Sequence, residues 1–140
     1  MVEALSKIFR FIVRNINFKI GWIGALLLGG FVYWINRKYG FNAAIVPAMK
    51  QFAYTFIVGG SLVRLSENIS MSYDNRAKSI ALAVLITTAI TAILLTALHL
   101  MRGTPNPFYT IFWTTLTAPP GFFMVAVLRR RKYDREYVED

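Results

Sequence analysis

Four long apolar stretches dominate this chain of 140 residues, and they constrain its fold more than any other feature. They cover residues 18–36, 43–66, 75–101 and 107–128. Each is close to the length of about 20 apolar residues that a helix needs to cross the hydrocarbon core of a bilayer. A soluble domain with 56% hydrophobic residues would expose large apolar patches. The pattern therefore predicts an all-α integral membrane protein with four transmembrane helices in one membrane domain, residues 1–140.

The connections between the apolar stretches are short and carry helix-ending and helix-starting residues. Gly40 is suited to end the first helix, Asp74 to cap the start of the third, and Asn106 with Pro107 to open the fourth. Such short connections place consecutive helices side by side and antiparallel. The sequence thus predicts a four-helix bundle of up-down-up-down topology.

Residues 1–17 show an amphipathic pattern. Apolar residues recur at spacings of three and four from Leu5 to Ile16, with charged residues on the opposite arc. We expect an interfacial helix that lies in the headgroup layer. The alternative is that this helix packs on a partner protein or on the ends of the bundle. At the other terminus, residues 129–140 form a charged tail.

Lysine and arginine residues are distributed unevenly about the predicted helices. Only four of the 16 lie on the side opposite the two termini: Arg37, Lys38, Lys50 and Arg102. Because the side richer in lysine and arginine faces the cytoplasm, both termini are expected there, in a cell inner or plasma membrane. On that side, Arg64 and Glu67 are three residues apart and are expected to pair. The net charge of +9 follows from this bias and from contact with anionic lipid headgroups, so nucleic acid is not an expected partner.

Small residues mark a packing face on the first predicted helix. Gly21, Ala25 and Gly29 recur every four residues, and small side chains let membrane helices approach closely. The partner of this face is either another helix of the same chain or a second copy.

Threonine is frequent in the third predicted helix. A helical wheel places Ala81, Thr88, Ala92, Thr96 and His99 on one face. Threonine hydroxyls bond readily to their own helix backbone, so we interpret this stripe as a packing seam in preference to a polar pathway.

Two consecutive prolines lie near the middle of the fourth predicted helix. Pro119 and Pro120 lack amide hydrogens, so the carbonyls of Thr115 and Leu116 lose their helical partners. Hydroxyls of the preceding threonines are expected to donate to them, because unsatisfied backbone groups are costly in hydrocarbon. The helix should be kinked or broken here, with the interruption facing protein. A structural kink is favoured, and a transporter-like substrate site is the alternative.

The half of the molecule opposite the termini holds cations but no carboxylate, since all seven acidic residues fall on the other side. A candidate site for an anion or a lipid headgroup therefore comprises Lys50, His99, Arg102, Thr115, Pro119 and Pro120. The depth of Lys50 depends on where its helix starts. If Asn42 caps the helix, Lys50 lies deep, whereas with Pro47 as the first helical residue, the more ordinary geometry, it lies near the surface.

The sequence contains little that could support catalysis. It has no cysteine and one histidine, which excludes metal sites built from several such ligands within the chain, and no catalytic motif is present. We expect no enzyme activity, no cofactor and no metal. The favoured function is an accessory or scaffold subunit, or an assembly factor, of a membrane complex. A small oligomeric transporter or channel is the alternative, ahead of a lipid-modifying enzyme. Expected partners are anionic lipids at the basic inner face and other membrane subunits or a second copy.

Overall fold

The computed structural model describes residues 14–101 and 104–137, and this part of the chain is helical apart from short turns. The predicted all-helical fold is confirmed. The elements in chain order are α2 (Phe18–Asn36), the 3-10 turn η1 (Arg37–Tyr39), α3 (Phe41–Tyr54), the π-helical segment η2 (Thr55–Gly59), α4 (Gly60–Ser70), α5 (Arg76–Leu100), α6 (Pro107–Leu116) and α7 (Ala118–Tyr137).

Three helical segments are long and apolar enough to cross a membrane, namely Phe18–Tyr39, Arg76–Leu100 and Pro107–Tyr137. The predicted amphipathic helix falls almost wholly outside the described residues. At the other terminus, the predicted charged tail continues α7 as helix as far as Tyr137.

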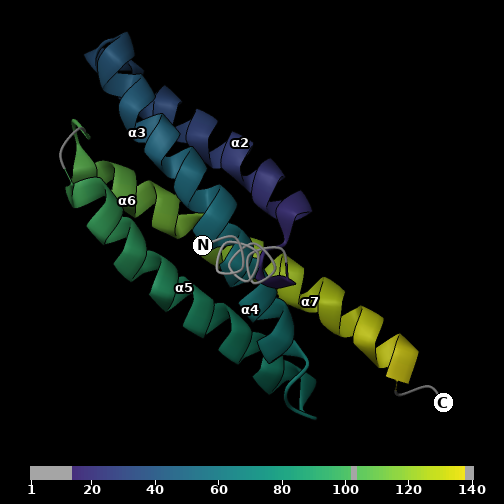
Figure 1. Cartoon of the computed structure of the whole chain (residues 1–140). Helices are drawn as coiled ribbons and strands as arrows, with labels where there is room; N and C mark the ends of the chain where they lie inside the picture. The colour runs from purple at the N-terminus through teal and green to yellow at the C-terminus, as the bar shows by residue number, and fades with distance from the viewer. Residues whose placement is uncertain (1–13, 102–103, 138–140) are drawn as a thin grey trace, which may run out of the picture.

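The helices lie lengthwise beside one another, and the chain reverses direction between α2 and α3, between α4 and α5, and between α5 and α6 (Figure 1). α2 packs on α3 and η2, while α5 packs on α4, α6 and α7. α4 also packs on α7, where Leu62, Val63 and Phe122 form a buried apolar cluster. By contrast, α2 touches α6 lightly and α7 hardly at all. Among the described residues, α2 and α7 therefore make few direct contacts.

The two ends of the bundle differ in their polar side chains. We call the end that holds Arg64, Arg76 and Arg130 the arginine-rich end, and the end that holds Asn36 and His99 the histidine end. At the arginine-rich end, the predicted pair of Arg64 and Glu67 is confirmed, with 3.1 Å between Nη1 and Oε2.

The small-residue face of α2 packs against η2 and α3 of the same chain. Gly21, Ala25 and Gly29 are all buried. A Cβ on Gly21 would lie 3.0 Å from the backbone oxygen of Phe56, and one on Gly29 would lie 3.2 Å from Cβ of Phe52. The sequence left the partner of this face undefined, and the structure shows that the partner belongs to the same chain.

The buried face of α5 differs from the predicted stripe. It consists of Ser79, Ala83, Thr87, Thr91, Leu95 and His99. Of the predicted stripe, Ala81 and Thr96 are exposed, Thr88 and Ala92 are partly buried, and only His99 belongs to the fully buried face. The reason is geometric: the buried residues follow the oblique four-residue ridge along which helices cross, whereas the predicted stripe ran along the helix axis.

Asparagine side chains cap the helices. Asn17 Oδ1 accepts from the Ile20 amide at 3.2 Å, and Asn106 Oδ1 accepts from the Tyr109 amide at 3.2 Å, with Pro107 as the first residue of α6, as predicted. α5 is capped by Asn75, whose Oδ1 accepts from the Lys78 amide at 2.9 Å. The prediction of Asp74 as this cap was wrong by one residue. Asp74 instead offers its carbonyl to Arg130.

Candidate functional site

The predicted interruption of the fourth long helix is present between α6 and α7. α6 ends at Leu116, Thr117 stands between the helices, and α7 begins at Ala118. Pro119 and Pro120 therefore lie in the first turn of α7, where an amide hydrogen has no helical partner to lose. The prolines thus begin a new helix after a break.

The threonine hydroxyls at the break bond to other carbonyls than expected. Thr114 Oγ1 donates to the Thr110 carbonyl and Thr117 Oγ1 to the Thr114 carbonyl, each at 2.7 Å. Thr115 Oγ1 is buried without a hydrogen-bond partner among the described residues. Thr114 is buried, but Thr117 and Pro120 are exposed, so only part of the interruption faces protein.

A second helix irregularity lies in the rod from α3 to α4. Thr55–Gly59 form a π-helical segment, in which one extra residue is accommodated in the helix. Such segments occur frequently at functional sites. No local sequence pattern predicts this segment. Its last residue is Gly59, and a second glycine, Gly60, comes directly after it.

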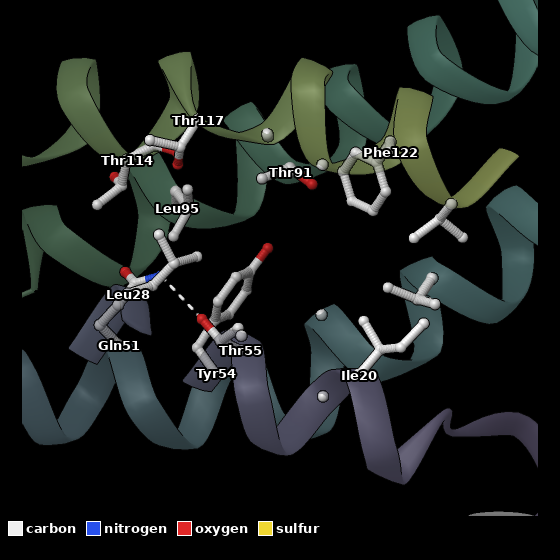
Figure 2. Close-up of a pocket in the computed structure, with 17 residues that line it drawn as sticks. Ile20, Leu28, Gln51, Tyr54, Thr55, Thr91, Leu95, Thr114, Thr117 and Phe122 are labelled. Atoms are coloured by element: carbon white, nitrogen blue, oxygen red, sulfur yellow. Dashed lines mark hydrogen bonds between the residues drawn. The ribbon is translucent and has the colours of Figure 1, made fainter. Parts of the chain in front are cut away.

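A cavity of about 160 Å³ lies between these two irregularities. Residues from α2 to α7 line it, including Gly24 and Leu28 of α2, Val63 of α4, and Gly121 and Phe122 of α7. Figure 2 shows Tyr54 pointing into this space from α3, with Thr91, Thr114 and Thr117 on the opposite wall. The broken helix and the π-helical segment are therefore opposite walls of one cavity.

The polar groups on the cavity wall are mostly engaged. Thr91 Oγ1 donates to the Thr87 carbonyl at 2.7 Å, and Gln51 Nε2 donates to Thr55 Oγ1 at 3.0 Å. The Tyr54 hydroxyl is buried and interacts with Thr91 across the cavity, although their geometry falls short of a regular hydrogen bond. The cavity thus presents mainly carbon.

At the histidine end, Gln51 also bonds to His99, which is buried. The distance from His99 Nε2 to Gln51 Oε1 is 2.9 Å, and from His99 Nδ1 to Thr104 Oγ1 it is 3.3 Å. Because the amide oxygen only accepts, these contacts assign the ring proton to Nε2, with Nδ1 accepting from the Thr104 hydroxyl. This chain of bonds joins α3 to α5 and to the turn after α5.

Lys50 lies deep in α3. The helix begins at Phe41 after Gly40, and Pro47 is inside it, so neither sequence-based start, Asn42 as cap or Pro47 as first residue, was right. Lys50 is about 13 Å along the axis from the first helical residue at 1.5 Å per residue. It is partly buried and near enough to His99 for electrostatic interaction. Arg102 lies outside the described residues.

The structure does not gather the candidate residues into one site. Lys50 and His99 lie near each other at the histidine end, whereas Thr115, Pro119 and Pro120 belong to the helix break. None of these five residues lines the central cavity. Their sequence neighbours Gln51, Thr114 and Ala118 do line it.

The sequence pattern did not identify the cavity-lining residues as a site, although some of the small residues that make room for the cavity can be seen in it. Gly24 lies on α2 one position before Ala25, and Gly121 directly follows the prolines. Small residues on two helices are what leave room between them. Comparison of the chain with protein-family models, with curated proteins and with solved structures gives no match.

Proposed function

We propose that this chain is a non-enzymatic membrane protein of four transmembrane helices that binds a membrane amphiphile in its central cavity. The second crossing would be the rod of α3, η2 and α4, which is continuous from Phe41 to Ser70 and exposes apolar side chains such as Met49 and Ile57. The excess of lysine and arginine supports a cytoplasmic arginine-rich end, with both termini on that side of a cell inner or plasma membrane.

The observation that carries the proposal is the cavity between the two helix irregularities. Its wall includes the exposed residues Thr117 and Gly121, so the space is open to the surrounding membrane and can admit an apolar chain. A cavity of about 150 Å³ holds one benzene molecule, so this one fits a segment of about six carbon atoms. An apolar occupant of that size would fill the space between the helices.

The chemistry of the wall favours an apolar segment over an anion. Hydroxyls that could line a polar pathway, those of Thr91, Thr114 and Thr117, donate to their own helices. The described lining residues include no lysine, arginine or histidine. These observations therefore give little support to an anion channel through the helix break, and they favour a lipid chain as the bound molecule.

Filling the cavity tests the proposal. A Cβ on Gly121 meets no heavy atom within 4 Å, so leucine at this cavity-lining position fits without a backbone clash and would reduce the space available to a bound chain. We expect G121L to lower the amount of lipid that co-purifies with the protein in mild detergent about tenfold, because displacing a well-fitted group costs 1–3 kcal/mol. Mass spectrometry of the intact complex measures the bound lipid.

The matched control is G30L. A Cβ on Gly30 also meets no heavy atom within 4 Å, and this exposed residue of α2 is not part of the cavity. G30L should retain the wild-type amount of lipid. Equal lipid in G121L and wild type, or no lipid in the wild type, would rule the proposal out.

An accessory or scaffold subunit of a membrane complex is the second candidate. The outward face of α6 carries large exposed aromatic and apolar side chains, among them Phe108, Phe112 and Trp113. Aromatic residues are enriched where proteins meet. Identification of the proteins that co-purify in mild detergent tests this candidate, and the absence of any specific partner would count against it.

A further inference from the structure

A second pocket continues the central cavity toward the arginine-rich end. It has a volume of about 240 Å³ and is lined by Ile20, Glu67, Val125, Leu128, Arg129 and Lys132. Ile20 and Val125 line both spaces. The two therefore adjoin along the gap where α2 and α7 hardly touch.

One face of α7 runs the length of both spaces. Gly121 and Val125 line the apolar part, while Arg129 and Lys132 follow at helical spacing and line the far part. Gly121 and Arg129 are separated by about 12 Å of helix, at 1.5 Å per residue. The two adjacent pockets together, called the groove below, are apolar at one end and cationic at the other.

Arg129 has spare hydrogen-bonding capacity in this pocket. Its Nε is buried and has no hydrogen-bond partner among the described residues. Its neighbour Arg130 differs, since that guanidinium donates to carbonyls of the α4–α5 turn and to Asp134. Buried polar groups are normally paired, so Arg129 Nε can bind an acceptor that the described residues do not supply.

The carboxylate in the pocket does not cancel the two cations. Glu67 pairs with Arg64 at 3.1 Å and accepts from Asn17 Nδ2 at 3.1 Å. Lys132 Nζ is 3.6 Å from Glu136 Oε1, but both side chains are largely exposed, so water weakens this pair. The far part of the groove thus keeps a positive charge.

Building on the function proposed above, we propose that the occupant is an anionic phospholipid, with an acyl chain in the central cavity and its phosphate at Arg129 and Lys132. A guanidinium matches two phosphate oxygens, and lysine adds a point charge. The apolar part of α7 ends at Leu128, so the two cations lie at the level expected for headgroups. Basic pockets between transmembrane helices bind such headgroups.

Lipid selectivity tests this assignment. The purified full-length chain is exchanged into micelles that contain phosphatidylglycerol or phosphatidylcholine with identical acyl chains, and bound lipid is measured by mass spectrometry of the intact protein. We expect the wild type to prefer phosphatidylglycerol about tenfold, and R129Q/K132Q to lose this preference while still binding phosphatidylcholine. R131Q/R135Q removes the same charge at exposed positions outside the pocket and should keep the preference.

Each other outcome has a defined meaning. Equal binding of both lipids by the wild type overturns the headgroup site but leaves the cavity function standing, whereas absence of both lipids rejects the two proposals together. Loss of preference in R131Q/R135Q would assign selectivity to overall charge and overturn the site, as would a preference retained in R129Q/K132Q. Displacement by excess inorganic phosphate would show that the pocket takes a free anion, which also overturns the lipid assignment.

Discussion

The guanidinium of Arg130 lies buried among backbone carbonyls of the turn between α4 and α5. Nη1 is 3.2 Å from the Ser70 oxygen and 2.6 Å from the Tyr73 oxygen, and Nη2 is 3.0 Å from the Asp74 oxygen. Nε is 2.7 Å from Asp134 Oδ1. One side chain thereby donates to the carbonyl of the last residue of α4 and to two carbonyls of the following turn, and it joins α7 to that turn.

We expect R130K to destabilise the fold by about 2–3 kcal/mol, because an ammonium cannot reproduce the planar fork and at least one carbonyl loses a charge-assisted hydrogen bond. Unfolding of the purified protein in mixed detergent micelles measures the change. R131K, at the adjacent exposed position, serves as the control and should unfold like the wild type. Equal stability of the two variants would show that the Arg130 contacts add nothing.

Single-residue roles were only partly predictable from the sequence. The pair of Arg64 and Glu67 followed from its spacing, because residues three apart share a helix face. Arg130 could not be told from its neighbours in the cluster RRRK, since only tertiary packing decides which arginine meets the turn. Of the two depths considered for Lys50, the shallow one was favoured because proline usually starts a helix, and it was wrong because Pro47 lies inside α3.

At the level of elements, the break between α6 and α7 follows from local chemistry. P119A/P120A restores two amide hydrogens that can bond to the carbonyls of Thr115 and Leu116, so α6 and α7 should merge into one straight helix. Spin labels on cysteines at the exposed positions Phe112 and Leu128 report this change. We expect their separation to increase toward the roughly 24 Å of a continuous helix.

The control is P47A, which restores an amide hydrogen in α3 and should leave that separation unchanged. An unchanged separation in P119A/P120A would mean that packing of the neighbouring helices, and not the prolines, maintains the break. The absence of cysteine from the natural chain makes the labelling specific.

The elements differ in how far local sequence determines them. The opening of α6 was predictable because Asn106 and Pro107 supply a cap and a fixed backbone angle. The π-helical segment was not, because its extra residue is stabilised by packing against α2 and not by a local motif. The same holds for the oblique buried face of α5, which depends on the angle at which α4 and α7 cross it.

At the scale of the whole molecule, the proposed topology predicts where each end can be labelled. Lys38 is exposed at the histidine end and Arg131 at the arginine-rich end. Each is replaced by cysteine, and intact cells are treated with a membrane-impermeant maleimide. K38C should react at once, and R131C only after permeabilisation, because the arginine-rich end is expected inside. Reaction of R131C in intact cells would reverse the orientation or disprove the number of crossings.

Hydrophobicity and turn residues were sufficient to predict an all-helical membrane protein, because the bilayer leaves few alternatives for such stretches. The cavity was not predictable, since it arises where residues from several helices fail to fill the space between them. Gly24, Tyr54 and Gly121 come from three different helices, and no spacing rule within one helix brings them together.

The scarcity of contacts between the described residues of α2 and α7 bears on how the proposed occupant would be exchanged. Under the proposed function, a lipid chain held between these two helices would leave sideways into the surrounding leaflet and would not have to pass through water. Its residence time would then be set by lateral diffusion and local lipid abundance, so the protein would sample the composition of the membrane around it.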